Sequence, residues 1–330
     1  MRKFSVPYNN ANPVEYLKKL DEYKEQVDSI YFGFSGVIIN HISNIEGEHG
    51  GIDENEDDII ENTKRFLELS KGKYKRVMTV NKAHLFEDDS TKYEYATKKL
   101  LPLIEKFGID AIIVADYRLA KIVHTIKPEL EIQTSCNCYQ FVYSAMDWWN
   151  RECGVTTFNP PREILRMPSL LRELSSQCKK RGFKLKCIVN EPCTFGCPMQ
   201  VNHSAYLSYG CIESQNHCLR SDKDPTDILK SNFVLPRHLH LFDPYVDIFK
   251  IAGRSFSTEK LFKRVDAYVN ERNDVDLKDC LCHVSMSCYE KLKMPVKMIP
   301  DKLLTCECKS CNECKVCEKV IEKFGRLSVE

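Results

Sequence analysis

The chain has 330 residues, of which 29% are charged, and its formal net charge is +1. This length allows one large domain or two ordinary ones, and the balanced charge excludes a bulk electrostatic attraction to nucleic acid or anionic membranes. No apolar run reaches membrane-spanning length, and the first residues lack the apolar core of a signal peptide. We therefore expect no membrane span and a cytoplasmic location.

Cysteine is unusually abundant, with 17 residues. A secreted disulfide scaffold would be shorter and richer in loops, whereas this chain is long, lysine-rich and helical in pattern. A reducing compartment fits better, and clustered cysteines in such a compartment are more often metal ligands than disulfides.

Short β-type runs alternate with stretches of helical periodicity along the chain. The predicted strands are 3–6, 29–32, 76–80, 111–114, 131–134, 156–158, 184–189 and 246–251. The predicted helices are 13–27, 59–69, 92–107, 118–126, 138–152, 169–181 and 257–269, the last with Ser257 or Thr258 as its N-cap.

Eight strands in this alternation predict a TIM-type (β/α)8 barrel over residues 1–271, although a doubly wound sheet could use the same pattern with fewer strands. Residues 41–58 form a Gly-rich acidic loop. Residues 190–245 form a Cys-rich insertion after strand seven, and residues 272–330 form a Cys-rich C-terminal extension.

Four cysteines, Cys193, Cys197, Cys211 and Cys218, lie in the insertion directly after a buried strand. Barrels place their chemistry at the carboxyl ends of strands, so these thiols are candidate ligands of a metal or cluster. Their spacings are looser than the paired knuckles of zinc sites, which favours a 4Fe–4S cluster over zinc. The alternative is that some are ordinary buried cysteines.

The segment CECKSCNECKVCEK holds five further candidate ligands: Cys306, Cys308, Cys311, Cys314 and Cys317. Repeated CxxC spacing indicates metal binding, and five thiols exceed the four that one ion or one cubane needs. A structural zinc, a second iron–sulfur cluster and a flexible thiol-rich tail remain open. A metal here would serve folding or electron relay.

Polar residues follow several strands and predict a rim suited to a polar organic substrate. Arg254 comes after Gly253 at the end of strand eight, where a guanidinium can bind a carboxylate or phosphate or pair with an acidic loop. Lys250 either lines the barrel or pairs internally. The candidate catalytic residues are Arg254, Asn190, Glu191 and Asn81.

Several motifs are absent from the sequence, among them GxSxG, HExxH, Walker A, GxGxxG and the CxxxCxxC of radical-SAM enzymes. No nucleophile–base pair stands out as a peptidase signature. RNA as a substrate has no basic-aromatic patch in its favour.

Five segments in order, VMTVNKAH, GIDAIIVADYRLAKIV, LEIQTSCNCYQFVYSAMDWWNRECGVTTFNPPREI, KLKCIVNEPC and VDIFKIAGRSFS, resemble peptidase family U32, the collagenase-like proteins. The resemblance covers roughly residues 1–270. Cys193 matches the family's first cysteine after its strand, whereas Cys197, Cys211 and Cys218 match only as a group. The chain reads TFGCPMQV where the family usually reads AYSGRC.

The resemblance implies a TIM-type barrel and, in its iron–sulfur branch, a 4Fe–4S cluster on four cysteines. That branch serves oxygen-independent hydroxylation in ubiquinone biosynthesis and RNA base modification, with prephenate as the implied oxygen donor, and some members work as heteromeric pairs. We therefore expect an iron–sulfur hydroxylase or related redox enzyme acting on a polar, anionic or RNA substrate. The alternatives are a peptidase and a non-catalytic iron–sulfur or zinc partner subunit.

Overall fold

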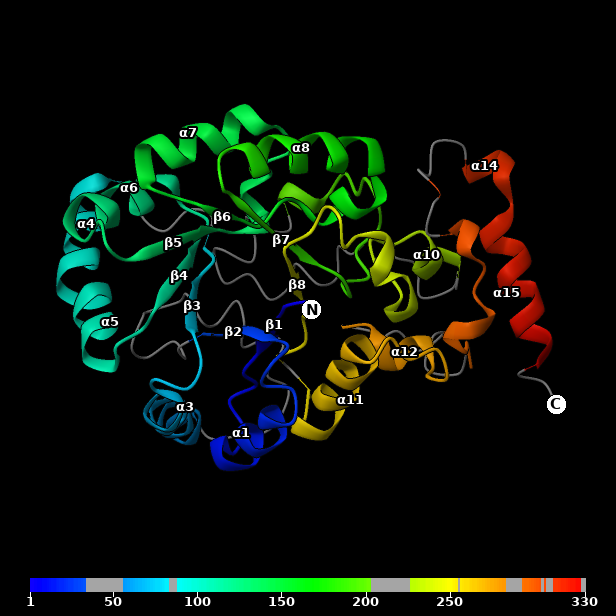
Figure 1. Ribbon diagram of the computed structural model, residues 1–330, viewed down its shortest axis with the longest axis horizontal. Helices are drawn as coiled ribbons and strands as arrows, with labels where there is room; N and C mark the ends of the chain where they lie inside the picture. Colours follow the sequence, from blue (N-terminus) through cyan, green and yellow to red (C-terminus); the bar gives the residue numbers. More distant parts are fainter. Residues whose placement is uncertain are drawn as a thin grey trace.

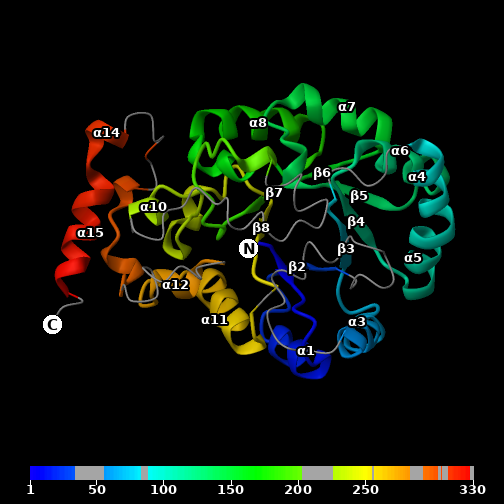
Figure 2. The same ribbon diagram turned by 180° about the vertical axis from the view of Figure 1, so that it is seen from behind.

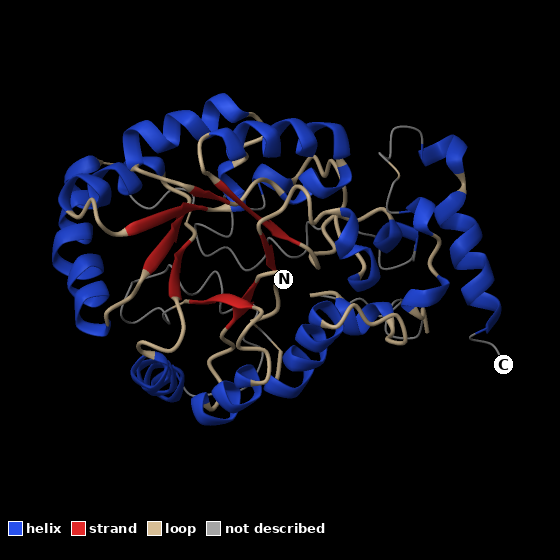
Figure 3. Cartoon of the chain, in the orientation of Figure 1, coloured by secondary structure: helices blue, strands red, loops and turns tan. Residues whose placement is uncertain are grey.

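The computed structural model describes residues 1–33, 56–82, 88–202, 226–254, 256–282, 293–303, 306 and 311–327. Within these residues eight parallel strands close into a barrel, each paired with the next and β8 paired with β1 (Figures 1 and 3). The strands are β1 Phe4–Pro7, β2 Val27–Phe32, β3 Arg76–Val80, β4 Ala111–Val114, β5 Glu131–Thr134, β6 Thr157–Phe158, β7 Lys184–Ile188 and β8 Ile248–Lys250. The TIM-type barrel is confirmed, and the doubly wound alternative is wrong.

Helices cover the outside of the barrel (Figure 3). They are α1 Pro13–Asp21, α3 Glu56–Ser70, α4 Asp89–Tyr95, the π-helical turn η1 Ala96–Leu100, α5 Leu101–Phe107, α6 Tyr117–Ile126, α7 Tyr143–Cys153, α8 Pro168–Lys180 and α11 Thr258–Val269. None of the helices in the described ranges is long and apolar enough to cross a membrane.

Side-chain caps explain where several helices begin. The Asn12 side chain accepts from the first amides of α1, and Asp116 accepts from Leu119 N at the start of α6. Ser257 caps α11, as the sequence predicts. Helix α7 ends at Gly154, which is left-handed with φ 65°, and a Cβ there would run into the His124 ring.

Several predicted helix boundaries are wrong. Helix α3 begins at Glu56 and α4 at Asp89, earlier than predicted, so residues 56–58 of the predicted loop 41–58 are helical, and the rest of that loop from 41 to 55 lies outside the described residues. The helix predicted over 13–27 ends at Asp21, where a run of turns precedes β2. The helix predicted over 138–152 begins only at Tyr143, because Cys136–Cys138 form a 3-10 turn (η2) that Tyr139 ends in the left-handed region at φ 50°.

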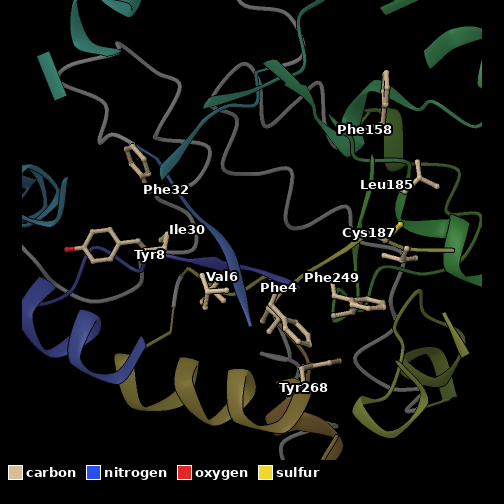
Figure 4. Close-up of a cluster of buried hydrophobic side chains, with 14 of the residues drawn as sticks. Phe4, Val6, Tyr8, Ile30, Phe32, Phe158, Leu185, Cys187, Phe249 and Tyr268 are labelled. Atoms are coloured by element: carbon tan, nitrogen blue, oxygen red, sulfur yellow. The ribbon is translucent and has the colours of Figure 1, made fainter. Parts of the chain in front are cut away.

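The main hydrophobic core lies between the strands and the surrounding helices. Outward-facing residues such as Phe4, Phe32 and Phe249 are almost fully buried. Phe4 and Phe249 lie beside Tyr268 of α11 (Figure 4), whereas Phe32 contacts the Phe66 ring of α3. Alternation along each strand sends the intervening residues to the inside of the barrel. Several of these inward-facing residues are polar, among them Ser29, Gln133 and Lys186, and they form part of the candidate site.

The chain after β8 packs back onto the barrel and continues into two helices at its side. Helix α12 (Leu277–Cys280) packs against α11, and the Cys282 amide donates to the Asn190 carbonyl at 2.9 Å. Helices α14 (Cys311–Cys314) and α15 (Val316–Leu327) follow, and α15 packs against α10 (Thr226–Leu229) of the insertion (Figures 1 and 2).

Candidate functional site

Two cationic side chains, Lys250 and Arg254, lie over the aromatic ring of Tyr31 at the carboxyl ends of the strands. The Lys250 Nζ lies 4.3 Å from the centroid of the Tyr31 ring, and the Arg254 guanidinium carbon lies 5.4 Å from it. Arg254 Nη1 donates to the Thr79 hydroxyl at 3.0 Å, and the Tyr31 hydroxyl donates to the Ile251 carbonyl at 2.8 Å. These contacts fix two positive charges at the barrel mouth, where an anionic group would be attracted to both.

Asn81 lies two residues beyond Thr79, on the loop after β3. Its side-chain oxygen is buried and has no hydrogen-bond partner among the residues that the structure describes. A buried polar atom of this kind normally has a partner, so a bound ligand is one way to satisfy it. Burial also lowers the pKa of the neighbouring Lys82 amine.

Lys186 occupies the middle of the barrel and is fully buried. Its amine on β7 donates to the Gln133 side-chain oxygen on β5 at 2.9 Å and to the Ser29 hydroxyl on β2 at 3.4 Å. Because these strands are not neighbours, the bonds must cross the barrel interior. Burial lowers the pKa of Lys186 from 10.5 to about 7, and the nearby positive charge of Lys250 adds to this shift.

Asn190 joins the ends of β7 and β8. Its amide donates to the Ala252 carbonyl at 2.9 Å and its oxygen accepts from the Ala252 amide at 2.7 Å, while a further bond reaches the Cys280 carbonyl at 3.3 Å. These bonds use both polar atoms of the side chain for holding the strand ends together. The catalytic role predicted for Asn190 stays a prediction.

Glu191 forms an ion pair with Arg162, whose Nε lies 2.6 Å from Glu191 Oε2. Arg162 is only 15% exposed. Burial acts to lower the pKa of Arg162, but electrostatic interactions with Cys136, Glu191 and Cys193 outweigh it and raise that pKa well above the usual range. The guanidinium is therefore placed to stabilise the thiolate form of Cys193, which is the form that ligates metals.

Cys193 begins a short two-stranded bridge. The Asn232 amide donates to the Cys193 carbonyl at 2.8 Å, and Thr194 pairs antiparallel with Ser231. Cys197 closes the following turn through a bond from its amide to the Thr194 carbonyl at 3.3 Å, and both thiols belong to half-buried residues.

The side chain of Asn232 is fully buried, and within the described ranges neither its oxygen nor its nitrogen has a partner. A side-chain amide without a partner, on the residue whose backbone pairs with Cys193, suits a ligand with acceptor atoms, such as the sulfides of an iron–sulfur cluster. This open amide is compatible with a cluster, and the ligand role of Cys193 and Cys197 stays a prediction. Cys211 and Cys218 lie outside the described residues.

In the C-terminal extension, one pocket is lined by the thiol residues Cys306, Cys314 and Cys317. Cys308 and the side chain of Cys311 lie outside what the structure describes. Among the described side chains, no three or more of His, Cys, Asp and Glu gather closely enough to hold a single metal ion.

Tyr31, Arg162 and Lys186 are not among the candidate site residues that the sequence predicts. A signal exists for Lys186 alone, because it stands within the strand KLKCI between the apolar residues Leu185 and Cys187. The importance of Tyr31 and Arg162 depends on partners that are distant in the sequence. Lys250 lines the barrel, which was one of its two expected positions.

The fold and this site define an α/β-barrel protein with a cationic mouth and a cysteine loop after β7. Residues 17–189 match the model of peptidase family U32, and the chain belongs to that family. An uncharacterized protease of Methanocaldococcus jannaschii is 27% identical over 233 residues, which cover 67% of this chain and 68% of that protein.

Two solved structures are similar to this chain at low TM-scores. A catalytic-lysine mutant of the Ruminococcus gnavus sialic acid aldolase has a TM-score of 0.39 and 11% identity, over 98% of this chain and 100% of that one. N-acetylneuraminate lyase of Mycoplasma synoviae has a TM-score of 0.40 and 9% identity, over 98% of each chain. Similarity at this level carries no information about function.

Proposed function

We propose that this protein is an iron–sulfur enzyme that modifies an anionic organic molecule bound at the barrel mouth. The observation that carries the proposal is the pair of cations, Lys250 and Arg254, held over Tyr31 where the strands end. Arg254 is oriented by Thr79, so its guanidinium is fixed before a ligand arrives. A carboxylate or phosphate at the strand ends would be attracted to both charges.

The cluster would be held by Cys193 and Cys197 together with Cys211 and Cys218. When bound, a 4Fe–4S cluster supplies one-electron chemistry, or Lewis-acid chemistry at an open iron. Arg162 would offset the thiolate charge, and the Asn232 amide would donate a hydrogen bond to a cluster sulfur. Asn81 and Lys250 would contact the substrate.

The finer form of the proposal is oxygen-independent hydroxylation with prephenate as the oxygen donor. Prephenate carries two carboxylates, which suit Lys250 and Arg254, and this charge match supports it as donor. The acceptor would be a polar organic molecule or an RNA base. A second member of the same family could act as a partner subunit.

Calorimetric titration of the protein with prephenate, citrate and inorganic phosphate tests the binding site. Arg254→Met removes a charge-assisted contact, so we expect about 10- to 100-fold weaker binding of the carboxylates. Arg118→Met, on the half-exposed start of α6, is the matched control and should leave affinity unchanged. Equal affinity in the Arg254 variant, or no binding of any of the three anions, would refute the anion site.

A peptidase is the second candidate, supported by the family and by the name of the archaeal relative. Within the described chain, His238 bonds to Asp301 at 2.7 Å and His240 bonds to the Arg237 carbonyl, and neither bond reaches a hydroxyl or a thiol. Cleavage of a peptide library that is lost in the Arg254 variant but kept in the Arg118 variant would favour this candidate.

A further inference from the structure

The Lys250 amine lies in a largely apolar part of the barrel mouth. Strand β8 ends at Lys250, which is 6% exposed, and its Nζ lies 4.3 Å from the centroid of the Tyr31 ring. That ring belongs to a small buried apolar cluster, separate from the main core, with Val77, Ala111 and Ile113. An amine in such surroundings is poorly hydrated, so its charged form loses part of the stabilisation that water provides.

Two other cationic side chains act on the same amine. The Arg254 guanidinium lies over the same ring, and the charge of Lys250 contributes to the lowered pKa of Lys186. Repulsion between two cations is mutual, so Arg254 and charged Lys186 both disfavour the ammonium form of Lys250. A lysine that is desolvated or lies beside another cation is the kind that enzymes use as a nucleophile toward carbonyl carbons.

Lys250, rather than Lys186, is suited to react with a carbonyl group. Lys186 is fully buried, and its amine is held by hydrogen bonds to Gln133 and Ser29, whereas Lys250 lies at the end of its strand. The Tyr31 ring also suits a covalent product. An iminium carries the same single positive charge as an ammonium, so the face of the ring attracts the reactant and the product alike.

Arg254 selects among carbonyl compounds by their charge. Its guanidinium donates to the Thr79 hydroxyl at 3.0 Å and is oriented to pair with a carboxylate. In a 2-oxo acid the carbonyl carbon is bonded directly to the carboxylate carbon. A carboxylate paired with Arg254 therefore brings the carbonyl toward the ring over which the Lys250 amine lies. Neutral ketones lack the anion for this pairing, and 2-hydroxy acids lack the carbonyl.

We propose that Lys250 forms a covalent iminium with 2-oxo acids whose carboxylate is bound by Arg254. The proposal rests on the proposed function, because it uses the same anion site. The amine nitrogen attacks the ketone carbon, and two of its hydrogens pass through water to the ketone oxygen. A carbon–nitrogen bond forms, the carbon–oxygen bond breaks, and one water leaves. Ammonium and ketone become iminium and water with no oxidation or reduction.

Reductive trapping tests the inference on anaerobically purified protein. Pyruvate or lactate is added with sodium cyanoborohydride, which reduces an iminium to a stable secondary amine, and peptide mass spectrometry locates the adduct. We expect an adduct at Lys250 with pyruvate and none with lactate. Lys250→Arg keeps the positive charge and should still bind lactate but lose the adduct. Arg254→Met should slow labelling at low pyruvate about 10- to 100-fold. Lys82→Arg, at a half-buried amine after β3, is the matched control and should label as wild type.

The wild-type comparison of pyruvate with lactate decides the matter even if a variant fails to fold. No adduct, an adduct only at lysines other than Lys250, or equal labelling of the Arg254 variant would overturn the inference. Calorimetric binding of pyruvate and lactate without any adduct would leave the anion site of the proposed function standing and remove the covalent step. An adduct at Lys250 in protein that contains neither iron nor acid-labile sulfide would do the reverse for the iron–sulfur function.

Discussion

Replacing Lys186 by Met should change how stability depends on pH. Lys186 is fully buried, and its pKa falls from 10.5 in water to about 7 in the folded protein. Between these two values the unfolded chain holds a proton that the folded protein lacks, so wild-type stability rises with pH. Below about pH 7 both the folded and the unfolded chain hold the proton. The folded state is then destabilised by the full cost of burying a charged lysine.

The size of the effect follows from the shift. Each pKa unit corresponds to about 1.4 kcal/mol, so burying the charged Lys186 lowers the free energy of unfolding near pH 7 by roughly 5 kcal/mol relative to its value at pH 10.5. Lys186→Met removes this cost, but the Gln133 side-chain oxygen loses its bond from Lys186 and the Ser29 hydroxyl keeps only Ser5, at a cost of about 1–3 kcal/mol. The variant should therefore be more stable than wild type near pH 7 and less stable near pH 10.

Urea unfolding under anaerobic conditions at pH 7, 8, 9 and 10 measures this difference. The free energy of unfolding of wild type relative to Lys186→Met should rise by about 1.4 kcal/mol per pH unit. Lys184→Met, at an exposed position of the same strand, is the matched control, and its curve should run parallel to wild type. If the free energy of unfolding of Lys186→Met also changes with pH in parallel with wild type, Lys186 is not neutral in the folded barrel and the reasoning is refuted.

Three further replacements test other contacts. Arg162→Gln should slow iodoacetamide alkylation of Cys193 in the metal-free protein about 3- to 10-fold, measured by mass spectrometry, and an unchanged rate would remove its role toward that thiol. Asn190→Leu should cost about 2–4 kcal/mol in urea unfolding, because the ends of β7 and β8 lose their link; a cost below 1 kcal/mol would contradict this. Asp116→Asn should cost about 3–5 kcal/mol by leaving Lys92 buried without its ion-pair partner at 2.9 Å, and a neutral result would refute the pair's importance.

The barrel could be predicted because short buried strands and amphipathic helices alternate over the whole length that forms it. Strands β3, β4 and β5 were predicted with the bounds that they have. The helix over 13–27 was extended too far because Tyr23 continues the apolar spacing after the helix ends. Periodicity reports which side of a segment is buried, and it says less about where the backbone leaves the helix.

Site residues could be predicted from the sequence only where they directly follow a predicted strand. Arg254 and Cys193 follow strands, so their place at the barrel mouth could be inferred from sequence. Asn190 follows a strand too, but its bonds to Ala252 show that a polar residue at a strand end can hold the barrel together. Arg162 could not be found this way, because its partners lie in another loop.

The central claim is that Cys193 ligates an iron–sulfur cluster, and metal analysis of anaerobically purified protein tests it most directly. Wild type should be brown and contain iron and acid-labile sulfide in equal amounts, and Cys193→Ser should lose about four of each while Cys178→Ser loses none. A colourless wild type with stoichiometric zinc, or a Cys193 variant with wild-type iron, would contradict the account.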